Sequence, residues 1–199
     1  MGTIEVICGP MFSGKTEELI RRLRRAAIAR RRVQVFKPRI DSRYDPDAVV
    51  SHTQQKIVST VIDKAGEVLQ KLAPDVEVIG IDEVQFLGPE IVPIVKDLAN
   101  KGVRVVVAGL DQDYRGQPFD PIPQLLAEAE YITKELAICV VCGNPAGRSQ
   151  RIADSEDRVH IGAQGAYEPR CRDHFSPEPQ PGTTPMQQEL LPFLRSNEG

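Results

Sequence analysis

Apolar residues fall into short continuous runs along the first two thirds of the chain. Four runs span residues 3–8, 32–37, 76–82 and 103–110, with little alternation between polar and apolar positions, and a fifth strand is expected over 129–139. Runs of this length without alternation are typical of strands that are covered on both faces of a parallel sheet.

Segments with helical spacing lie between these runs. Residues 16–30 place Leu19, Leu23 and Ala26 on one face, as a helix packed against a sheet requires. Shorter helices are expected over 65–73 and 89–102. Strands that alternate with helices predict an α/β fold with a parallel sheet flanked by helices, and we assign it residues 1–138.

The pattern changes twice outside this alternation. Residues 38–56 are polar and rich in turn formers, which predicts a loop. From residue 139 onward, short strand-like pieces such as "QRIA" and "RVHIG" alternate with Gly and Arg, so residues 139–175 are expected to form a small second domain. Residues 176–199 contain four prolines before Met186, a composition that predicts disorder.

Charge and composition narrow the class of protein. The chain has 199 residues, a formal net charge of −3 and a sequence pI near 5.7, which argues against a dedicated nucleic-acid-binding protein. The sequence contains no apolar run long enough to span a bilayer and no secretory leader, so we expect no membrane association. A cytoplasmic location follows as an expectation, and disulfides are rare in that reducing compartment.

The segment "GPMFSGKT" matches the phosphate-binding pattern G-x-x-x-x-G-K-[ST]. It follows an expected strand and opens an expected helix, which is the context that the pattern requires. Backbone N–H groups and the helix N-terminus would bind phosphate oxygens, the lysine would reach the terminal phosphates, and the threonine hydroxyl would bind Mg²⁺. The predicted ATP and Mg²⁺ contacts here are Gly9, Pro10, Met11, Phe12, Ser13, Gly14, Lys15 and Thr16.

Two adjacent acids follow the apolar run at 76–82. Asp82 would lie at the carboxyl edge of the sheet, where a carboxylate can reach Mg²⁺. Glu83 would then be placed to accept a proton from an attacking hydroxyl or water. The sequence therefore predicts an ATP- or GTP-using protein, without choosing between a kinase, a hydrolysing motor and a switch.

Three cysteines and one histidine form two half-sites of metal-ligand type. Cys139 and Cys142 make one C-x-x-C pair, and Cys171 and His174 have the same spacing, with 28 residues between the two half-sites. Three thiolates and one imidazole are a closed, structural Zn²⁺ set. His160 is a competing fourth ligand, although it lacks the two-residue spacing. A redox role for the C-x-x-C pair would leave the second half-site unexplained.

The motifs "GPMFSGKT", "IDEVQF", "AGLDQDYRGQPF", "CVVCG" and "GAYEPRCRDH" occur in this order. In order and spacing the chain resembles the cytosolic, zinc-containing thymidine kinases over residues 1–175. The resemblance implies a RecA-like sheet with a small zinc-binding lasso domain. It implies transfer of the γ-phosphoryl of ATP to the 5′-hydroxyl of thymidine for nucleotide salvage, and it suggests a homotetramer and feedback inhibition by thymidine triphosphate.

The resemblance also implies roles for individual residues. Glu83 matches the catalytic base, and Asp41 and Arg43 match positions that act at Mg²⁺ and the transferring phosphate. The lasso would cover the nucleoside between the zinc half-sites. The positions that match the thymidine pocket and the lasso are Met11, Phe86, Leu110, Tyr114, Phe119, Ser149, Val159, Ile161, Gly162 and Tyr167.

Two positions depart from the common pattern of the family. Tyr114 stands where a phenylalanine is common, and His174 replaces a cysteine seen in some members. The first change could alter the floor of the pocket, whereas a set of three cysteines and one histidine remains an ordinary zinc site.

One alternative comes from another class of protein. Seven arginines lie in "RRLRRAAIARRR", and zinc ribbons joined to RecA-like cores also occur in DNA-dependent motors. A DNA-stimulated ATPase would show DNA-driven ATP hydrolysis and binding that falls steeply with salt.

Overall fold

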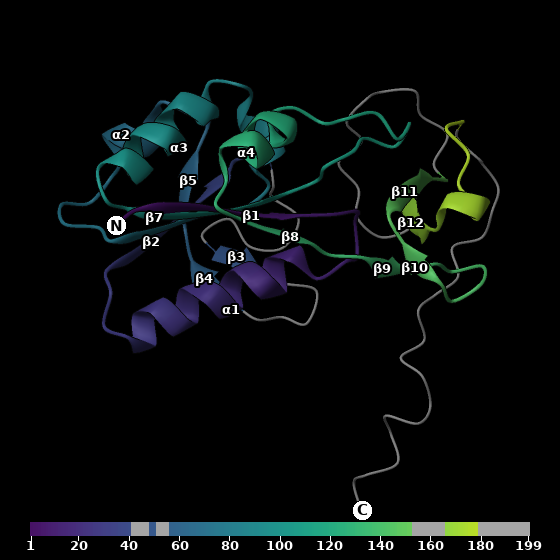
Figure 1. Ribbon diagram of the computed structural model, residues 1–199, viewed down its shortest axis with the longest axis horizontal. Helices are drawn as coiled ribbons and strands as arrows, with labels where there is room; N and C mark the ends of the chain where they lie inside the picture. Colours follow the sequence, from purple (N-terminus) through teal and green to yellow (C-terminus); the bar gives the residue numbers. More distant parts are fainter. Residues whose placement is uncertain (41–47, 51–55, 153–165, 179–199) are drawn as a thin grey trace, which may run out of the picture.

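The computed structural model describes residues 1–40, 48–50, 56–152 and 166–178. A six-stranded sheet, parallel throughout, lies at its centre in the order β5-β2-β6-β7-β1-β8 (Figure 1). This arrangement confirms the predicted α/β class. The strands are β1 (Thr3–Cys8), β2 (Val33–Pro38), β5 (Thr60–Ile62), β6 (Val78–Ile81), β7 (Arg104–Gly109) and β8 (Tyr131–Lys134).

Helices cover both faces of this sheet (Figure 1). α1 (Lys15–Ile28) packs Leu19 and Leu23 against one face, together with Ile7 from β1. The other face carries α2 (Glu67–Gln70), α3 (Ile91–Asn100) and α4 (Ile122–Glu128), whose apolar side chains pack against β1, β6 and β7. Because the strands are buried on both sides, their sequences show the unbroken apolar runs from which they were predicted.

The loop expected over residues 38–56 contains regular structure, so that expectation was wrong in part. β3 (Ala48–Val50) pairs antiparallel with β4 (Lys56–Val58). Three-residue strands of this kind depend on pairing with a partner strand rather than on a long apolar pattern. β5 and α4 were also absent from the sequence-based expectations, as was the short helix η1 (Val84–Leu87).

The single strand expected over 129–139 is two strands. β8 ends at Lys134, and the Glu135 N–H donates to the Cys8 carbonyl oxygen at 2.8 Å, just past the β1–β8 ladder. β9 (Ala137–Ile138) instead pairs antiparallel with β10 (Pro145–Ala146). The remaining described elements are β11 (Arg148–Arg151), β12 (Tyr167–Arg170) and η2 (Arg172–His174).

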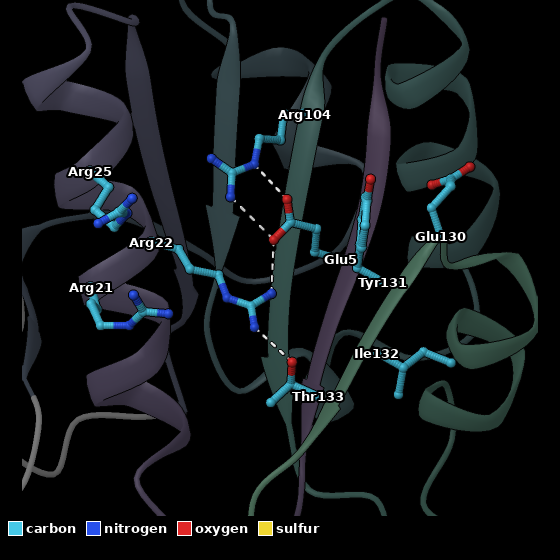
Figure 2. Close-up of a pocket in the computed structure, with 9 residues that line it drawn as sticks. All are labelled: Glu5, Arg21, Arg22, Arg25, Arg104, Glu130, Tyr131, Ile132 and Thr133. Carbon is cyan, nitrogen blue, oxygen red and sulfur yellow. Dashed lines mark hydrogen bonds and ion pairs between the residues drawn. The ribbon is translucent and has the colours of Figure 1, made fainter.

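A buried ionic network ties α1 to the sheet near its β8 edge (Figure 2). Glu5, on β1, is 8% exposed and accepts hydrogen bonds from Arg22 on α1 at 2.8 Å and from Arg104 on β7 at 2.6 Å. Arg22 also donates to the Thr133 hydroxyl on β8 at 2.7 Å. One carboxylate thereby joins a helix and three neighbouring strands, which is why a charged residue is tolerated inside the apolar run of β1.

None of the helices in the described part of the chain combines the length and the apolar character needed to cross a bilayer.

Candidate active site and metal centre

The predicted phosphate loop connects β1 to α1 at the carboxyl edge of the sheet. Gly9 has a φ of 145°, and a Cβ atom there would lie 2.2 Å from the Glu135 carbonyl oxygen. Gly14 has a φ of 86° at the N-cap of α1. Both positions therefore need glycine, which explains why the motif requires glycine at its first and sixth positions.

Side chains of the loop fold back onto its own backbone. The Ser13 hydroxyl donates to the Pro10 carbonyl oxygen at 2.9 Å, and the Lys15 ammonium group donates to the same oxygen at 2.6 Å. Lys15 is only 9% exposed and stands at the first position of α1. Its charge thus lies at the positive end of the helix dipole, where an anion is favoured.

A chain of hydrogen bonds connects the phosphate loop to the two acids. The Thr16 hydroxyl donates to one oxygen of Asp82 at 3.2 Å, and the Glu83 N–H donates to the other at 3.0 Å. The Gln85 amide then donates to the Glu83 carboxylate at 2.5 Å. Asp82 is 4% exposed. A hydroxyl and a carboxylate in direct contact at this edge are a suitable pair of Mg²⁺ ligands.

The backbone of Glu83 is unusual. Its φ is 48° and its ψ is 41°, in the left-handed region that non-glycine residues seldom adopt. Gln85 connects Glu83 to the end of β7. Its amide oxygen accepts a hydrogen bond from the Leu110 N–H at 3.1 Å, and its amide nitrogen donates to the Glu83 carboxylate. Strained backbone conformations of this kind are often found at active sites.

Aromatic side chains gather beside these acids. The rings of Phe86 and Phe119 meet edge to face, with centroids 6.3 Å apart and an interplanar angle of 87°. Tyr114 and Tyr167 form a second buried cluster, against which Met11 packs. Seven of the ten predicted pocket positions are described, and five of them fall in these two groups.

Ser149 attaches the pocket to the phosphate loop. Its hydroxyl accepts the Met11 N–H at 2.9 Å, across 138 residues of sequence. Ser149 lies on β11, which pairs with β12, the strand that begins at Tyr167. The two-stranded sheet of β11 and β12 therefore contacts the predicted ATP site directly.

Several predicted residues cannot be placed. Asp41 and Arg43 lie outside the described residues, and so do the lasso positions Val159, Ile161 and Gly162. His160, the competing zinc ligand, lies outside them as well. The strands on either side of the predicted lasso, β11 and β12, are described, and the Ile152 N–H donates to the Ala166 carbonyl oxygen at 2.9 Å.

Two buried polar residues in this region were not singled out from the sequence. Gln85 is 4% exposed and supports Glu83, and Arg151 is fully buried between tyrosines. The only local signal for Gln85 was a polar residue in the apolar segment "VQFL". Arg151 gave no such signal, because its partners are distant in sequence.

The four predicted zinc ligands converge. The ligand atoms of Cys139, Cys142, Cys171 and His174 all lie within 4.8 Å of one another. The Sγ atoms of Cys142 and Cys171 are 3.7 Å apart, and the Cys139 Sγ lies 3.8 Å from the His174 Nδ1. In a tetrahedral site with Zn–S bonds of about 2.3 Å, sulfur atoms are separated by about 3.8 Å, so the group fits zinc.

Local backbone structure favours the thiolate form of one of these cysteines, Cys139. Burial opposes ionisation of Cys139, but the N–H groups of Cys171, Val141 and Cys142 donate toward it and lower its pKa to about 6. Gly143, with a φ of 73°, turns the chain after the first half-site, and its N–H donates to the Cys139 carbonyl oxygen at 2.9 Å. A thiol with a low pKa is readily available as the thiolate that binds metal.

Comparison with known proteins identifies the assembly of phosphate loop, paired acids and cysteine–histidine group. The family model described as thymidine kinase matches residues 2–175. The chain belongs to the thymidine kinase family. Membership makes it a phosphotransferase and accounts for ATP and Mg²⁺ as the cofactors of the phosphate loop.

Curated relatives agree with the assignment to the thymidine kinase family. A thymidine kinase of Rhodothermus sp. (strain ITI 518) is 58% identical over 184 residues, which cover 92% of this chain and 85% of the relative. A thymidine kinase of Bdellovibrio bacteriovorus (strain HD100) is 56% identical over 177 residues, covering 89% and 87%. Nothing in these comparisons supports the DNA-stimulated ATPase.

One solved structure shows a more distant likeness to this chain. Domain III of the Thermotoga maritima replication initiation protein DnaA aligns with a TM-score of 0.39 and 16% identity, over 66% of this chain and 54% of that one. A likeness this loose has no bearing on the assignment to the thymidine kinase family.

Proposed function

We propose that the protein transfers the γ-phosphoryl group of ATP to the 5′-hydroxyl of thymidine, giving thymidine monophosphate and ADP. The observation that carries the proposal is the chain of contacts from Thr16 through Asp82 to Glu83. It brings a Mg²⁺-binding pair and a carboxylate base together beside the phosphate loop, within a chain whose family is thymidine kinase.

The phosphate loop would hold ATP through its backbone N–H groups. Lys15 would leave the Pro10 carbonyl oxygen and turn to the β- and γ-phosphates, which offer it a charged partner in place of a neutral one. Thr16 and Asp82 would hold Mg²⁺, with Asp41 and Arg43 proposed at the same phosphates. Bound Mg²⁺ neutralises the charge that develops during transfer.

Glu83 would act as the base. Its carboxylate accepts the proton of the 5′-hydroxyl as that oxygen attacks the γ-phosphorus, and the bond to the β-phosphate oxygen breaks to release ADP. Gln85 donates to the same carboxylate and would help to fix its orientation toward the substrate.

The aromatic groups would form the nucleoside pocket. Phe86 would pack on the thymine ring, with Phe119 set edge to face behind it. Tyr167 would contact the sugar. The remaining proposed walls are Met11, Leu110, Tyr114 and Ser149, with the lasso backbone at Val159, Ile161 and Gly162.

Zinc would serve as a structural restraint. Held by the three cysteines and His174, it would clamp both ends of the lasso without entering the reaction. We accordingly propose residues 139–175 as a zinc-binding lasso domain on a nucleotide-binding domain of residues 1–138, with the C-terminal residues 176–199 as a disordered tail.

Association and regulation extend the same proposal. We propose a cytoplasmic homotetramer that is inhibited by thymidine triphosphate and that requires neither nucleic acid nor membrane. The edge strand β8 supports association, since Tyr131 and Ile132 on it are 59% and 55% exposed. Apolar side chains on an open strand edge favour contact with another chain.

An acceptor panel tests the proposed reaction. The purified protein would be incubated with ATP and Mg²⁺ plus thymidine, deoxyuridine, deoxycytidine, DNA or no acceptor, and nucleoside monophosphate would be measured. We expect thymidine monophosphate in equimolar amount with ADP. ATP consumption that depends on DNA, with no phosphorylated nucleoside, would contradict the proposal.

A further inference from the structure

Arg151 is the largest side chain that is fully buried among the described residues. It stands at the end of β11, directly opposite Tyr167 of β12 in the antiparallel register. An arginine so far from water is costly unless its charge and its N–H groups are engaged. Its described contacts include both tyrosines of the proposed nucleoside pocket.

The contacts of Arg151 are specific. Its guanidinium carbon lies 3.7 Å from the centroid of the Tyr114 ring and 5.1 Å from that of the Tyr167 ring. One of its terminal N–H groups donates to the Tyr167 hydroxyl oxygen. Such stacking is favourable for a desolvated cation, and the planar guanidinium can stack on one ring while it donates in its own plane to the other side chain.

Arg115 also contacts Tyr114. Its Nε donates to the Tyr114 hydroxyl oxygen at 2.8 Å, and its guanidinium carbon lies 5.2 Å from the centroid of the same ring. Each tyrosine oxygen therefore accepts a hydrogen bond from an arginine. Tyr114, which replaces the common phenylalanine, has a polar partner for its hydroxyl group.

A guanidinium group can only donate hydrogen bonds. Because the Tyr167 oxygen accepts from Arg151, the proton of the Tyr167 hydroxyl must point away from the guanidinium. We propose that Arg151 is a positioning residue for nucleoside recognition: it fixes the Tyr114 ring and turns the Tyr167 hydroxyl so that its proton is donated to an acceptor oxygen on the sugar of the substrate.

The inference rests on the proposed thymidine kinase reaction and adds a residue to it. It is supported by the face of β11 on which Arg151 lies. Ser149, two residues earlier and thus on the same face, holds the Met11 N–H at the phosphate loop. Arg148 lies on the opposite face and stacks at 5.7 Å on the ring of Phe175 instead.

Arg148 therefore supplies a matched control. We would compare Arg151→Met and Arg151→Lys with Arg148→Met, which also removes an arginine of β11 that stacks on a ring. For Arg151→Met we expect the KM for thymidine to rise about tenfold or more, with the KM for ATP within about twofold and kcat within about threefold. Arg151→Lys should recover part of the loss, since lysine can still donate to Tyr167.

A double-mutant cycle with Tyr167→Phe separates orientation from packing. If Arg151 acts through the Tyr167 hydroxyl, Tyr167→Phe should weaken thymidine binding in the wild type and change it little in the Arg151→Met background. Arg151→Leu, which likewise cannot donate a hydrogen bond, takes the place of Arg151→Met in the cycle if Arg151→Met does not fold. Additive effects, or a thymidine KM no higher than that of Arg148→Met, would overturn the inference.

Binding measured without ATP distinguishes this inference from the proposed reaction. The chain has four tyrosines and no tryptophan, so tyrosine fluorescence can report thymidine binding at this pocket. A wild-type protein that fails to phosphorylate thymidine contradicts the proposed function. A wild-type protein that binds thymidine no better than Arg151→Met does contradicts the role of Arg151, whatever the catalytic result.

Discussion

At the scale of single residues, the two acids after β6 differ in what surrounds them. Asp82 is buried and held by Thr16 and by the Glu83 N–H. Glu83 is less buried, lies on strained backbone and accepts a hydrogen bond from Gln85. A buried carboxylate in contact with a hydroxyl group suits metal binding, whereas a more exposed carboxylate is better placed to accept a proton from a substrate.

Replacing Glu83 with Gln tests this division. The amide keeps the size of the side chain but cannot accept the proton, so turnover should fall on the order of 100-fold or more. ATP and thymidine binding should stay nearly unchanged, as measured by calorimetry beside steady-state kinetics. Glu128→Gln, which removes an exposed carboxylate of α4 that pairs with Lys96, is the control and should keep full turnover.

Near-normal turnover in the Glu83→Gln variant would show that Glu83 is not the catalytic base. The hydrogen bond from Gln85 would then have to be explained as support of the strained backbone alone.

At the scale of elements, the small lobe is held in two ways. The β11–β12 ladder holds Ile152 next to Ala166, and the cysteine–histidine group brings together the two ends of the lobe itself. The ladder does not depend on metal. Loss of metal should therefore loosen the lobe around the pocket more than it disturbs the six-stranded sheet.

Cys171→Ser tests the metal centre. We expect about one zinc ion per wild-type chain by mass spectrometry of metals and a strong loss in the variant. The KM for thymidine should rise severalfold, and ATP binding should change by less than about twofold, because the phosphate loop lies between β1 and α1. The Cys8→Ala variant is the control, since Cys8 lies in the buried core and burial raises its pKa to about 11.

Full zinc content in the Cys171→Ser variant would exclude Cys171 as a ligand. Equal loss of thymidine and ATP binding, accompanied by loss of the helical circular dichroism signal, would show that the whole fold depends on the metal.

At the scale of the whole molecule, Glu5 connects α1, β1, β7 and β8 through Arg22 and Arg104. Burial alone would raise the pKa of Glu5, but the two guanidinium groups outweigh burial and lower it from its ordinary value of 4.5. A carboxyl with a lowered pKa in the folded state stabilises the protein above about pH 4.5. This contribution is lost as the pH falls below 4.5 and through the pKa of the folded state.

The Glu5→Gln variant should therefore unfold more easily at pH 7, by on the order of 2 kcal/mol from the lost charged hydrogen bonds. The difference from the wild type should shrink as the pH falls below 4.5, because the wild type then protonates Glu5 on unfolding. Urea unfolding followed by circular dichroism between pH 3 and pH 7 measures both effects. A constant difference across that range would contradict the ionic origin.

Glu77→Gln is the control for this prediction. Glu77 also has a lowered pKa, through the Arg32 N–H and Arg31, but it lies at the surface, where solvent screens the pair. We expect its replacement to change stability little at any of these pH values.

The sequence by itself determined the local features of this protein. The phosphate loop, the acids after β6, the cysteine–histidine spacing and the main strands could be predicted, because each depends on neighbouring residues or on a period along one element. The sequence also indicated the family, because the order and spacing of the motifs can be read without knowing which residues are in contact. The short strands β3 and β5 escaped prediction because their pairing partners, and not their own sequences, make them strands.

Only the tertiary structure decided which distant residues meet. The strand order β5-β2-β6-β7-β1-β8, the break between β8 and β9, and the contacts of Gln85 with Leu110 and of Ser149 with Met11 all join segments far apart in sequence. Arg151 is the clearest case, because it is fully buried and contacts Tyr114 and Tyr167, neither of which is near it in sequence. The role of such a side chain depends on its burial and on its contacts, and both are properties of the folded chain.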